Sequence, residues 1–271
     1  MSPTRRFLDP LVTYLLLLLL RVLRPVCAGP WDLSTFRLCN TLYLQEIDSN
    51  ASGVTYVPES NTLWIVVNNP PGLYEYTMEG ALQRKINLWW LRDPEDVVYV
   101  SRDRVAVVEE PPGGGIRVLD VSRSGGGMQT EYISLIYYPR SGGSGAEGLS
   151  YDPQSGTFYV AQEKRPKGVY AIRRTRWYTN CTKIIDGDVA FNSVGDLSAI
   201  NYIPDLNEFF VLSQESSRVL RTTLEGQVLQ EIGVKGSSAE GLHMMSDGLT
   251  MLVVSEPNVM RIYRADGCGN K

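Results

Sequence analysis

The chain has 271 residues, a formal charge of −4 at pH 7 and one histidine. Nucleic acids and anionic membrane surfaces are bound by clustered Lys and Arg, so an acidic chain of this kind is not expected to bind either. The single histidine and the absence of a Cys-x-x-Cys pair also argue against a zinc or copper site.

The first 28 residues differ in composition from the rest. A basic pair at Arg5-Arg6 precedes an apolar run over residues 11–20, and small residues end at Ala28. This order predicts a secretory signal peptide over residues 1–28, because the run is shorter than the about 20 apolar residues that span a bilayer. Arg21 and Arg24 are unusual inside a cleaved signal, so an uncleaved membrane anchor is the alternative. We expect a secreted or secretory-lumen protein, membrane-attached only if this segment is retained.

From residue 29 onward, one pattern recurs five times. Glu or Ser is followed by a small residue, an alternating apolar strand, a turn and a second apolar strand with a polar end. The copies start at Ser52, Glu95, Glu147, Ser198 and Glu240, at spacings of 42 to 52 residues. Such a period with several short strands per copy is typical of β-propeller blades. Residues 29–271 are therefore predicted to form one all-β domain, a five-bladed β-propeller of four-stranded antiparallel blades, with a six-bladed ring as the disfavoured alternative.

The two ends of the repeat region predict how the ring closes. The fifth copy reaches the C-terminus after three strands, and residues 36–47, before the first copy, can supply its missing outer strand. Cys39 lies in this segment and Cys268 follows the last copy. Closure brings them together, so a Cys39–Cys268 disulfide is the preferred pairing, with three unpaired thiols as the alternative. Cys181 is then left over.

Two Asn-x-Ser/Thr sequons are present, at Asn50-Ala51-Ser52 and Asn180-Cys181-Thr182. Behind a signal peptide, both Asn50 and Asn180 are candidate glycosylation sites. Asn50 is close to the start of a predicted strand, where it can be shielded.

The repeat also predicts two rings of acidic residues around the central channel. The first strand of each blade lines the channel, which brings together Glu95, Glu147 and Glu240, with Ser52 and Ser198 in the other two blades. A second ring lies at the ends of the second strands and contains Glu110, Glu163, Glu215 and Glu256, with Asn69 completing it.

Converging carboxylates repel one another, so either some stay protonated or a cation neutralises them. Calcium is the expected cofactor, because it prefers six to eight hard oxygen ligands. All seven glutamates are candidate ligands. The alternative is structural: these carboxylates cap neighbouring backbone amides and hold the blades together without any metal.

Catalytic signals are weak. The one histidine, His243, lies on the first strand of the fifth blade, and a Gly-x-Ser-x-Gly nucleophile motif is absent. His243 is better interpreted as a packed or hydrogen-bonded residue. Hydrolysis by a Ca²⁺-bound water with a Glu base needs no histidine and remains an alternative.

Three motifs resemble the SdiA-regulated (YjiK-like) family: Glu147 to Pro153, Asp196 to Ile200 and Ser255 to Asn258. The resemblance covers about residues 42–265. It implies a five-bladed propeller, distantly similar to NHL-repeat propellers, with a calcium site at Glu95, Glu147 and Glu240. The chain departs from the pattern at Ser52 and Ser198, so a cation is expected nearer one side of the ring.

Together these observations predict a secreted, monomeric, calcium-binding propeller. We expect it to act as a non-catalytic module that binds a protein or small-molecule ligand on one face. The alternative is a calcium-dependent hydrolase that acts on a lactone or a phosphoester.

Overall fold

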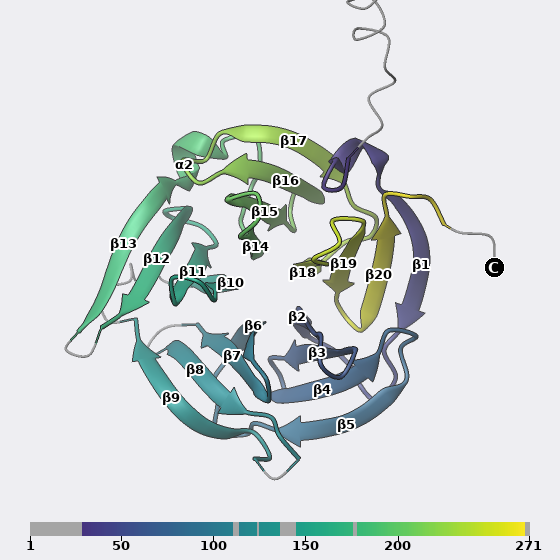
Figure 1. The fold of residues 1–271 in the computed structure, drawn as a ribbon, viewed down its shortest axis with the longest axis vertical. Coiled ribbons are helices and arrows are strands. Elements are labelled where there is room, and N and C mark those ends of the chain that lie inside the picture. Colours follow the sequence, from purple (N-terminus) through teal and green to yellow (C-terminus); the bar gives the residue numbers. More distant parts are fainter. Residues whose placement is uncertain (1–28, 111–113, 124, 136–144, 176–177, 269–271) are drawn as a thin grey trace, which may run out of the picture.

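The computed structural model describes residues 29–110, 114–123, 125–135, 145–175 and 178–268, so the predicted signal peptide lies outside the described residues. Five four-stranded antiparallel sheets surround a central axis (Figure 1), which confirms the all-β, five-bladed propeller. Within the described ranges, no helix is long and apolar enough to cross a membrane.

Each blade runs from an inner strand at the axis to an outer strand at the rim. Blade 1 contains β2 (Ala51–Val57), β3 (Thr62–Val67), β4 (Gly72–Thr77) and β5 (Leu82–Asn87). Blade 2 contains β6 (Pro94–Ser101), β7 (Arg104–Glu109), β8 (Gly115–Asp120) and β9 (Met128–Ser134). Blade 3 contains β10 (Ala146–Asp152), β11 (Thr157–Gln162), β12 (Gly168–Arg174) and β13 (Thr179–Asp186), and is followed by the short helix α2 (Gly187–Ala190). Blade 4 contains β14 (Ala199–Ile203), β15 (Glu208–Ser213), β16 (Arg218–Thr223) and β17 (Val228–Gly233).

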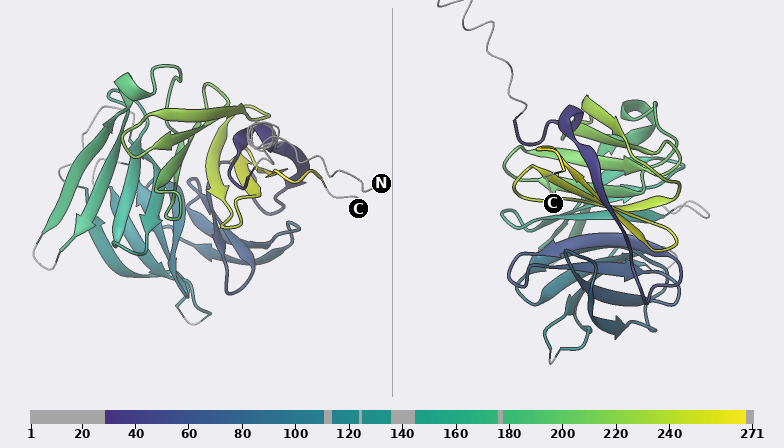
Figure 2. Two further views of the ribbon diagram at one scale, coloured as in Figure 1. Left: turned by 45° about the horizontal axis from the view of Figure 1, so that its top comes forward. Right: turned by 90° about the vertical axis from the view of Figure 1, so that its right-hand side faces the viewer.

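Blade 5 joins the two ends of the chain. Its inner strands are β18 (Ala239–Met244), β19 (Thr250–Ser255) and β20 (Val259–Arg264), and its outer strand is β1 (Arg37–Tyr43). β1 pairs antiparallel with β20 and lies along it in Figure 2. Cys39 and Cys268 form a disulfide beside this pairing. The segment before the first repeat thus closes the ring, as the sequence predicted.

The hydrophobic core is divided into five clusters, one at each seam between neighbouring blades. Strands with apolar residues on both faces form these seams, since each middle strand packs against a blade on either side. The seam between blades 4 and 5 also buries Leu33, which opens the 3-10 helix η1 (Leu33–Thr35), and Trp31 and Phe36 on either side of this helix. The N-terminal segment therefore fills a seam before it enters the outer strand.

Four of the five inner strands contain a β-bulge at the residue that opens the repeat. The register shifts between Ala51 and Gly53, Pro94 and Asp96, Ala146 and Gly148, and Ala239 and Gly241. A bulge leaves one residue unpaired and redirects its side chain. The residues redirected in this way are Ser52, Glu95, Glu147 and Glu240.

Candidate functional site

One end of the central channel is a small polar cavity, here called the acidic cavity. Its volume is about 200 Å³, and its lining residues come from all five blades: Ser52, Asn68, Glu95, Glu147, Glu163, Ser198, Gln214, Glu240 and Glu256. The first predicted ring is present in full. Of the second ring, Glu163 and Glu256 line the cavity.

The glycine that follows the bulge lets neighbouring inner strands approach one another closely. A Cβ at Gly148 would lie 2.7 Å from the Ile200 nitrogen, and one at Gly241 would lie 2.8 Å from the Ser52 carbonyl oxygen. Real Cβ atoms do not come this near to backbone atoms. The small residue of the repeat therefore brings the bulged residues of adjacent blades around one narrow opening.

Blade 2 has an aspartate where the others have a small residue. Asp96 is buried, and its carboxylate accepts hydrogen bonds from its neighbour Val97 N at 2.8 Å and from Leu149 N of blade 3 at 2.8 Å. Burial nevertheless raises the pKa of Asp96 well above its ordinary value. This carboxylate joins two blades, which is the structural role that the sequence left open for the channel acids.

In two blades, the second-ring residue that lines the cavity is the one directly before the residue predicted from the sequence repeat. Asn68, rather than Asn69, follows β3 into the cavity, and Gln214, rather than Glu215, follows β15. Glu215 instead forms an ion pair with Lys164 at 3.0 Å, and Lys164 also contacts Glu163 at 2.7 Å.

Backbone hydrogen bonds position the second ring. In four blades, the residue after the second strand donates its N–H to the carbonyl of the residue two positions before the bulge, as Glu110 does to Asp93 at 3.0 Å. In blade 4 the side chain of Asp196 makes the corresponding contacts. It accepts hydrogen bonds from Glu215 N at 3.1 Å and from the Ser213 hydroxyl, the residues on either side of Gln214. Gln214, like Asn68, is the residue directly after its second strand, and this is the position that lines the cavity.

Each second-ring residue faces the first-ring residue of the next blade. Asn68 Nδ2 lies 3.5 Å from Glu95 Oε1, and Gln214 Nε2 donates to Glu240 Oε1 at 2.6 Å. By the same geometry, Glu163 and Glu256 face Ser198 and Ser52. Four junctions therefore pair one carboxylate with one neutral side chain.

The junction between blades 2 and 3 is the exception, because it brings together Glu110 and Glu147. Asp93 adds a further carboxylate there. Oxygen atoms of Asp93, Glu95 and Glu110 lie within 4.8 Å of one another. The excess negative charge of the channel is thus gathered at one side of the ring, and sequence reasoning missed Asp93 because it stands outside the repeat.

Burial and mutual repulsion raise the pKa values of these acids. For Glu147, burial is the main cause, followed by the charges of Glu163, Glu110, Glu240 and Asp93. The pKa of Glu95 rises because of burial and then the charges of Glu147 and Asp93. Glu110 is raised to about 7 by burial, then by Asp93. Without a counter-ion, some of these side chains therefore hold protons at neutral pH.

Glu240 shows the same trend on the other side of the ring. Burial and the charge of Glu256 raise its pKa to about 7, while the ammonium of Lys164 opposes this rise. The nearby amide of Gln214 is its hydrogen-bond donor. Glu240 therefore has an amide donor and an ammonium nearby, which oppose but do not cancel the repulsion from its acidic neighbours.

The donor set fits a hard divalent cation such as Ca²⁺. Carboxylate, amide and hydroxyl oxygens line the acidic cavity, and the described lining contains no His or Cys. Among the described residues, Asn68 Oδ1 is a buried oxygen without a hydrogen-bond partner. A buried acceptor without a partner destabilises the fold, so a cation bound to Asn68 Oδ1 would supply the interaction that this oxygen lacks. Asp93, Glu95, Glu110 and Asn68 are the residues that would hold the ion.

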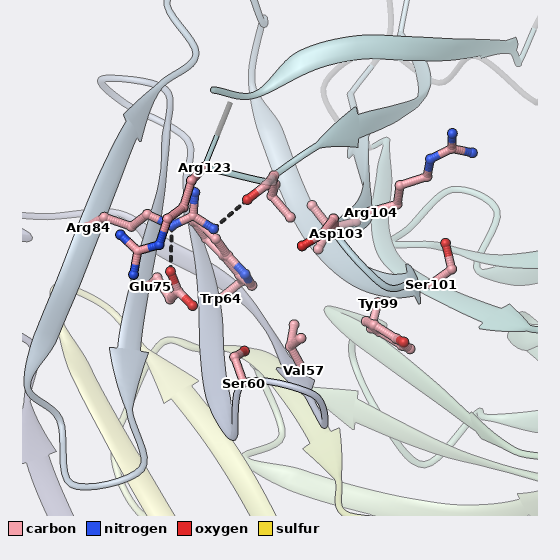
Figure 3. Close-up of a pocket in the computed structure, with 12 residues that line it drawn as sticks. Val57, Ser60, Trp64, Glu75, Arg84, Tyr99, Ser101, Asp103, Arg104 and Arg123 are labelled. Atoms are coloured by element: carbon pink, nitrogen blue, oxygen red, sulfur yellow. Dashed lines mark hydrogen bonds and ion pairs between the residues drawn. The ribbon is translucent and has the colours of Figure 1, made fainter. Parts of the chain in front are cut away.

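Another cavity, of about 180 Å³, lies at the seam between blades 1 and 2. Its central cation is Arg84, which pairs with Glu75 at 2.5 Å, donates to the Val121 carbonyl and lies over the Trp64 ring (Figure 3). Because this guanidinium is already bound on several sides, the cavity is interpreted as part of the inter-blade packing.

The two sequons are placed differently. Asn180 is exposed on the outer strand β13, whereas Asn50 is half-buried directly before β2. Ser52 of the first sequon is buried and lines the acidic cavity. The position of Asn180 is therefore the more accessible of the two.

Several solved propellers have a similar fold. A gluconolactonase from Xanthomonas campestris has a TM-score of 0.54 with 12% identity, over 89% of this chain and 98% of that chain. The calcium-binding protein regucalcin from Agrobacterium tumefaciens has a TM-score of 0.51 with 13% identity, over 80% and 85%. A chain of a nidogen–laminin complex has a TM-score of 0.53 with 12% identity, over 77% and 73%. At these identities the likeness is one of fold.

The family model gives a more specific result than these folds. It matches residues 33–264, which span all five blades and the strand that closes the ring. As the sequence motifs indicated, the chain belongs to the SdiA-regulated family.

Proposed function

We propose that the protein is a calcium-binding propeller, with Ca²⁺ held at the edge of the acidic cavity by carboxylates of blade 2 and by Asn68 of blade 1. One observation carries this proposal: oxygen atoms of Asp93, Glu95 and Glu110 lie within 4.8 Å of one another, and the amide of Asn68, whose Oδ1 is buried and unpartnered, lies against Glu95. A divalent cation would relieve the repulsion that raises the pKa values of these acids.

Calcium binding can be measured directly. Protein freed of metal with EDTA is titrated with CaCl₂ in a calorimeter, and the melting temperature is followed in parallel. Saturable binding that is lost in Glu95→Gln and kept in Glu79→Gln, at an exposed turn, is the expected result. Equal binding by both variants, or no heat of binding and no change in melting temperature, would contradict the proposal.

With calcium bound, the leading role is that of a non-catalytic module that binds a ligand or protein on a propeller face. The ion would tie blades 1 and 2 together through Asn68 and the blade 2 carboxylates, and would fix the loops around the channel mouth. This role is supported by the small volume and polar lining of the acidic cavity, whose described residues include no His, Cys or Lys.

A calcium-dependent hydrolase is the second candidate. It is favoured by Glu240, whose pKa near 7 suits a general base. A gluconolactonase is also among the proteins with a similar fold. A bound Ca²⁺ would supply an electrophile for a carbonyl or phosphoryl oxygen. Turnover on lactone and phosphoester panels that is abolished by Glu240→Gln in a folded protein would favour the enzyme, and its absence would favour the module.

Secretion and glycosylation are part of the same proposal. The exposed position of Asn180 supports its use as an acceptor site. Expression of the full chain in a secreting eukaryotic cell should give medium-borne protein whose mass falls on glycosidase treatment and in Asn180→Gln. Retention in the cell membrane would instead support the uncleaved anchor.

A further inference from the structure

The other end of the central channel has a different chemistry. A cavity of about 380 Å³, here called the aromatic cavity, is lined by Tyr56, Tyr99, Tyr151, Tyr202, Asn201 and His243, among other residues. These positions follow the first-ring residues by three or four positions on the same inner strands. At a rise of about 3.3 Å per residue, the two cavities lie about 10–13 Å apart along the channel axis.

The four tyrosines occupy equivalent positions, because each is the fourth residue after the Glu or Ser that opens the repeat in its blade. The hydroxyl groups of three of them are held by hairpin turns. Tyr56 Oη donates to Asn61 Oδ1 at 3.0 Å, Tyr202 Oη donates to Asn207 Oδ1 at 3.0 Å, and Tyr99 Oη donates to Glu59 Oε1 of the neighbouring blade at 2.6 Å. The aromatic wall is therefore fixed before any ligand arrives, which reduces the entropy lost on binding.

The floor of the aromatic cavity offers hydrogen-bond donors. Side-chain oxygens of three inner strands accept from the backbone of the next blade: Thr55 from Tyr99 N at 2.9 Å, Ser150 from Tyr202 N at 2.8 Å and Asn201 from Met244 N at 2.7 Å. Each of these oxygens already accepts one hydrogen bond and keeps one lone pair, whereas the hydroxyl hydrogens and the two Asn201 amide hydrogens give the floor four donor hydrogens.

His243 completes the floor in blade 5. Burial lowers its pKa to about 4, so the imidazole is neutral at physiological pH and carries one N–H donor and one acceptor. Its ring lies 6.4 Å from that of Tyr56. The only histidine of the chain thus adds polarity without charge.

The charge of the wall narrows the choice of ligand. The described residues that line the aromatic cavity include no Lys or Arg, and Asp205 is the one acidic residue among them. An anion would find no counter-ion there, and a cation would meet the donor hydrogens of the floor. The cavity instead suits a neutral molecule with one apolar face and several oxygen acceptors.

We propose that the aromatic cavity binds an uncharged cyclic ligand of sugar size, whose flat face packs on the tyrosine rings and whose oxygens accept from the floor. Its volume is within the range of about 300–1,000 Å³ that small-molecule sites have. The site stands at the opposite end of the channel from the calcium site and does not depend on it.

The test uses three matched probes that share a pyranose ring and differ in charge: methyl glucoside, glucuronate and glucosamine. Saturation-transfer NMR is recorded on the purified protein in EDTA, so that the acidic cavity contributes no metal-bound ligand. We expect transfer from the tyrosine protons to methyl glucoside, and at least tenfold weaker binding of both charged sugars.

Two tryptophan variants locate the site. Gln154→Trp places a bulky side chain at the rim of the aromatic cavity, from an exposed turn position, and should abolish binding. Gln83→Trp, on the exposed face of the outer strand β5, should leave binding unchanged. Melting curves check that both are folded. No transfer to methyl glucoside, transfer retained in Gln154→Trp, or tighter binding of a charged sugar would each overturn the proposal.

Discussion

The side-chain amide of Asn68 lies 3.5 Å from the carboxylate of Glu95, across the seam between blades 1 and 2. The same relationship joins Gln214 to Glu240 between blades 4 and 5, at 2.6 Å. Such an amide lowers the cost of burying a carboxylate, because it donates a hydrogen bond to the charged form. Neutral residues of the second ring therefore decide where negative charge accumulates in the channel.

Replacement of the amide should make the channel more dependent on calcium. Asn68→Asp removes a donor from Glu95 and adds a carboxylate beside the cluster. In EDTA at pH 7.5, we expect the free energy of unfolding to fall by about 1–3 kcal/mol. Saturating Ca²⁺ should recover most of this loss. Denaturant melts of the variant and of Gln83→Glu, on the exposed face of β5, check the effect. A loss that calcium does not recover would count against a cation at this position.

Glu147→Gln should raise the melting temperature in EDTA but reduce the further rise that calcium causes. Burial and four neighbouring acids raise the pKa of Glu147, so its ionisation costs stability as the pH rises above about 4.5. In EDTA at pH 7.5 the variant should therefore melt higher than the native protein. This advantage should vanish near pH 4, where the native side chain is neutral in both states.

The same variant should gain less from calcium. Glu147 faces the cluster of Asp93, Glu95 and Glu110, so its charge contributes to the attraction for a cation. We expect the calcium-induced rise in melting temperature to be reduced in Glu147→Gln and unchanged in Glu79→Gln. An unaltered response in both variants would place the cation away from the junction of blades 2 and 3.

His243 should make the protein less stable in mild acid. Its pKa is lowered to about 4 in the folded state, from an ordinary value of 6.5. As the pH falls, the imidazole is therefore protonated in the unfolded chain before it is protonated in the folded protein. The stability that the neutral ring contributes is complete above pH 6.5 and is lost as the pH falls toward 4. His243→Gln removes this titration. The difference in unfolding free energy between native and variant protein should therefore depend on pH only in that window, which denaturant melts from pH 4 to 8 would measure.

Gly148→Ala should damage the channel wall. The added Cβ would lie 2.7 Å from the Ile200 nitrogen and 2.9 Å from Ala199 backbone atoms, which cannot move without displacing a strand. We expect a loss of about 1–3 kcal/mol in unfolding free energy, typical of overpacking. In Gly233→Ala the nearest atom is 4.0 Å away, so little change is expected. Similar stability of the two variants would contradict this explanation of the glycine in the repeat.

Loss of the Cys39–Cys268 disulfide should destabilise the closed ring. The bridge spans 229 residues and therefore restricts the unfolded chain strongly. Cys268→Ser should cost about 2–5 kcal/mol in unfolding free energy. Cys181→Ser removes a free thiol and should lower the unfolding free energy by less than Cys268→Ser does. Addition of a reductant should lower the melting temperature of the native protein and leave Cys268→Ser unaffected.

The repeat alone was enough to predict the five blades, the inner strands and the strand exchange at the ring closure. Ser52, Glu95, Glu147, Ser198 and Glu240 all line the acidic cavity because equivalent residues of a ring point to one axis. The tyrosines of the other cavity recur at a fixed spacing, so the same reasoning could have located them. Their significance was missed because a tyrosine in a strand is usually a packing residue.

Other features depend on the tertiary structure. Asp93 joins Glu95 and Glu110 only because a loop before β6 turns back toward the end of β7. Gln214, rather than Glu215, lines the cavity because β15 ends at Ser213, and Glu215 instead pairs with Lys164. A sequence repeat fixes which strands surround the channel, since hydrophobic periodicity sets the blades. Which side chains meet across a seam is set by loop hydrogen bonds and bulges, and these distances of a few ångströms exist only once neighbouring blades are packed.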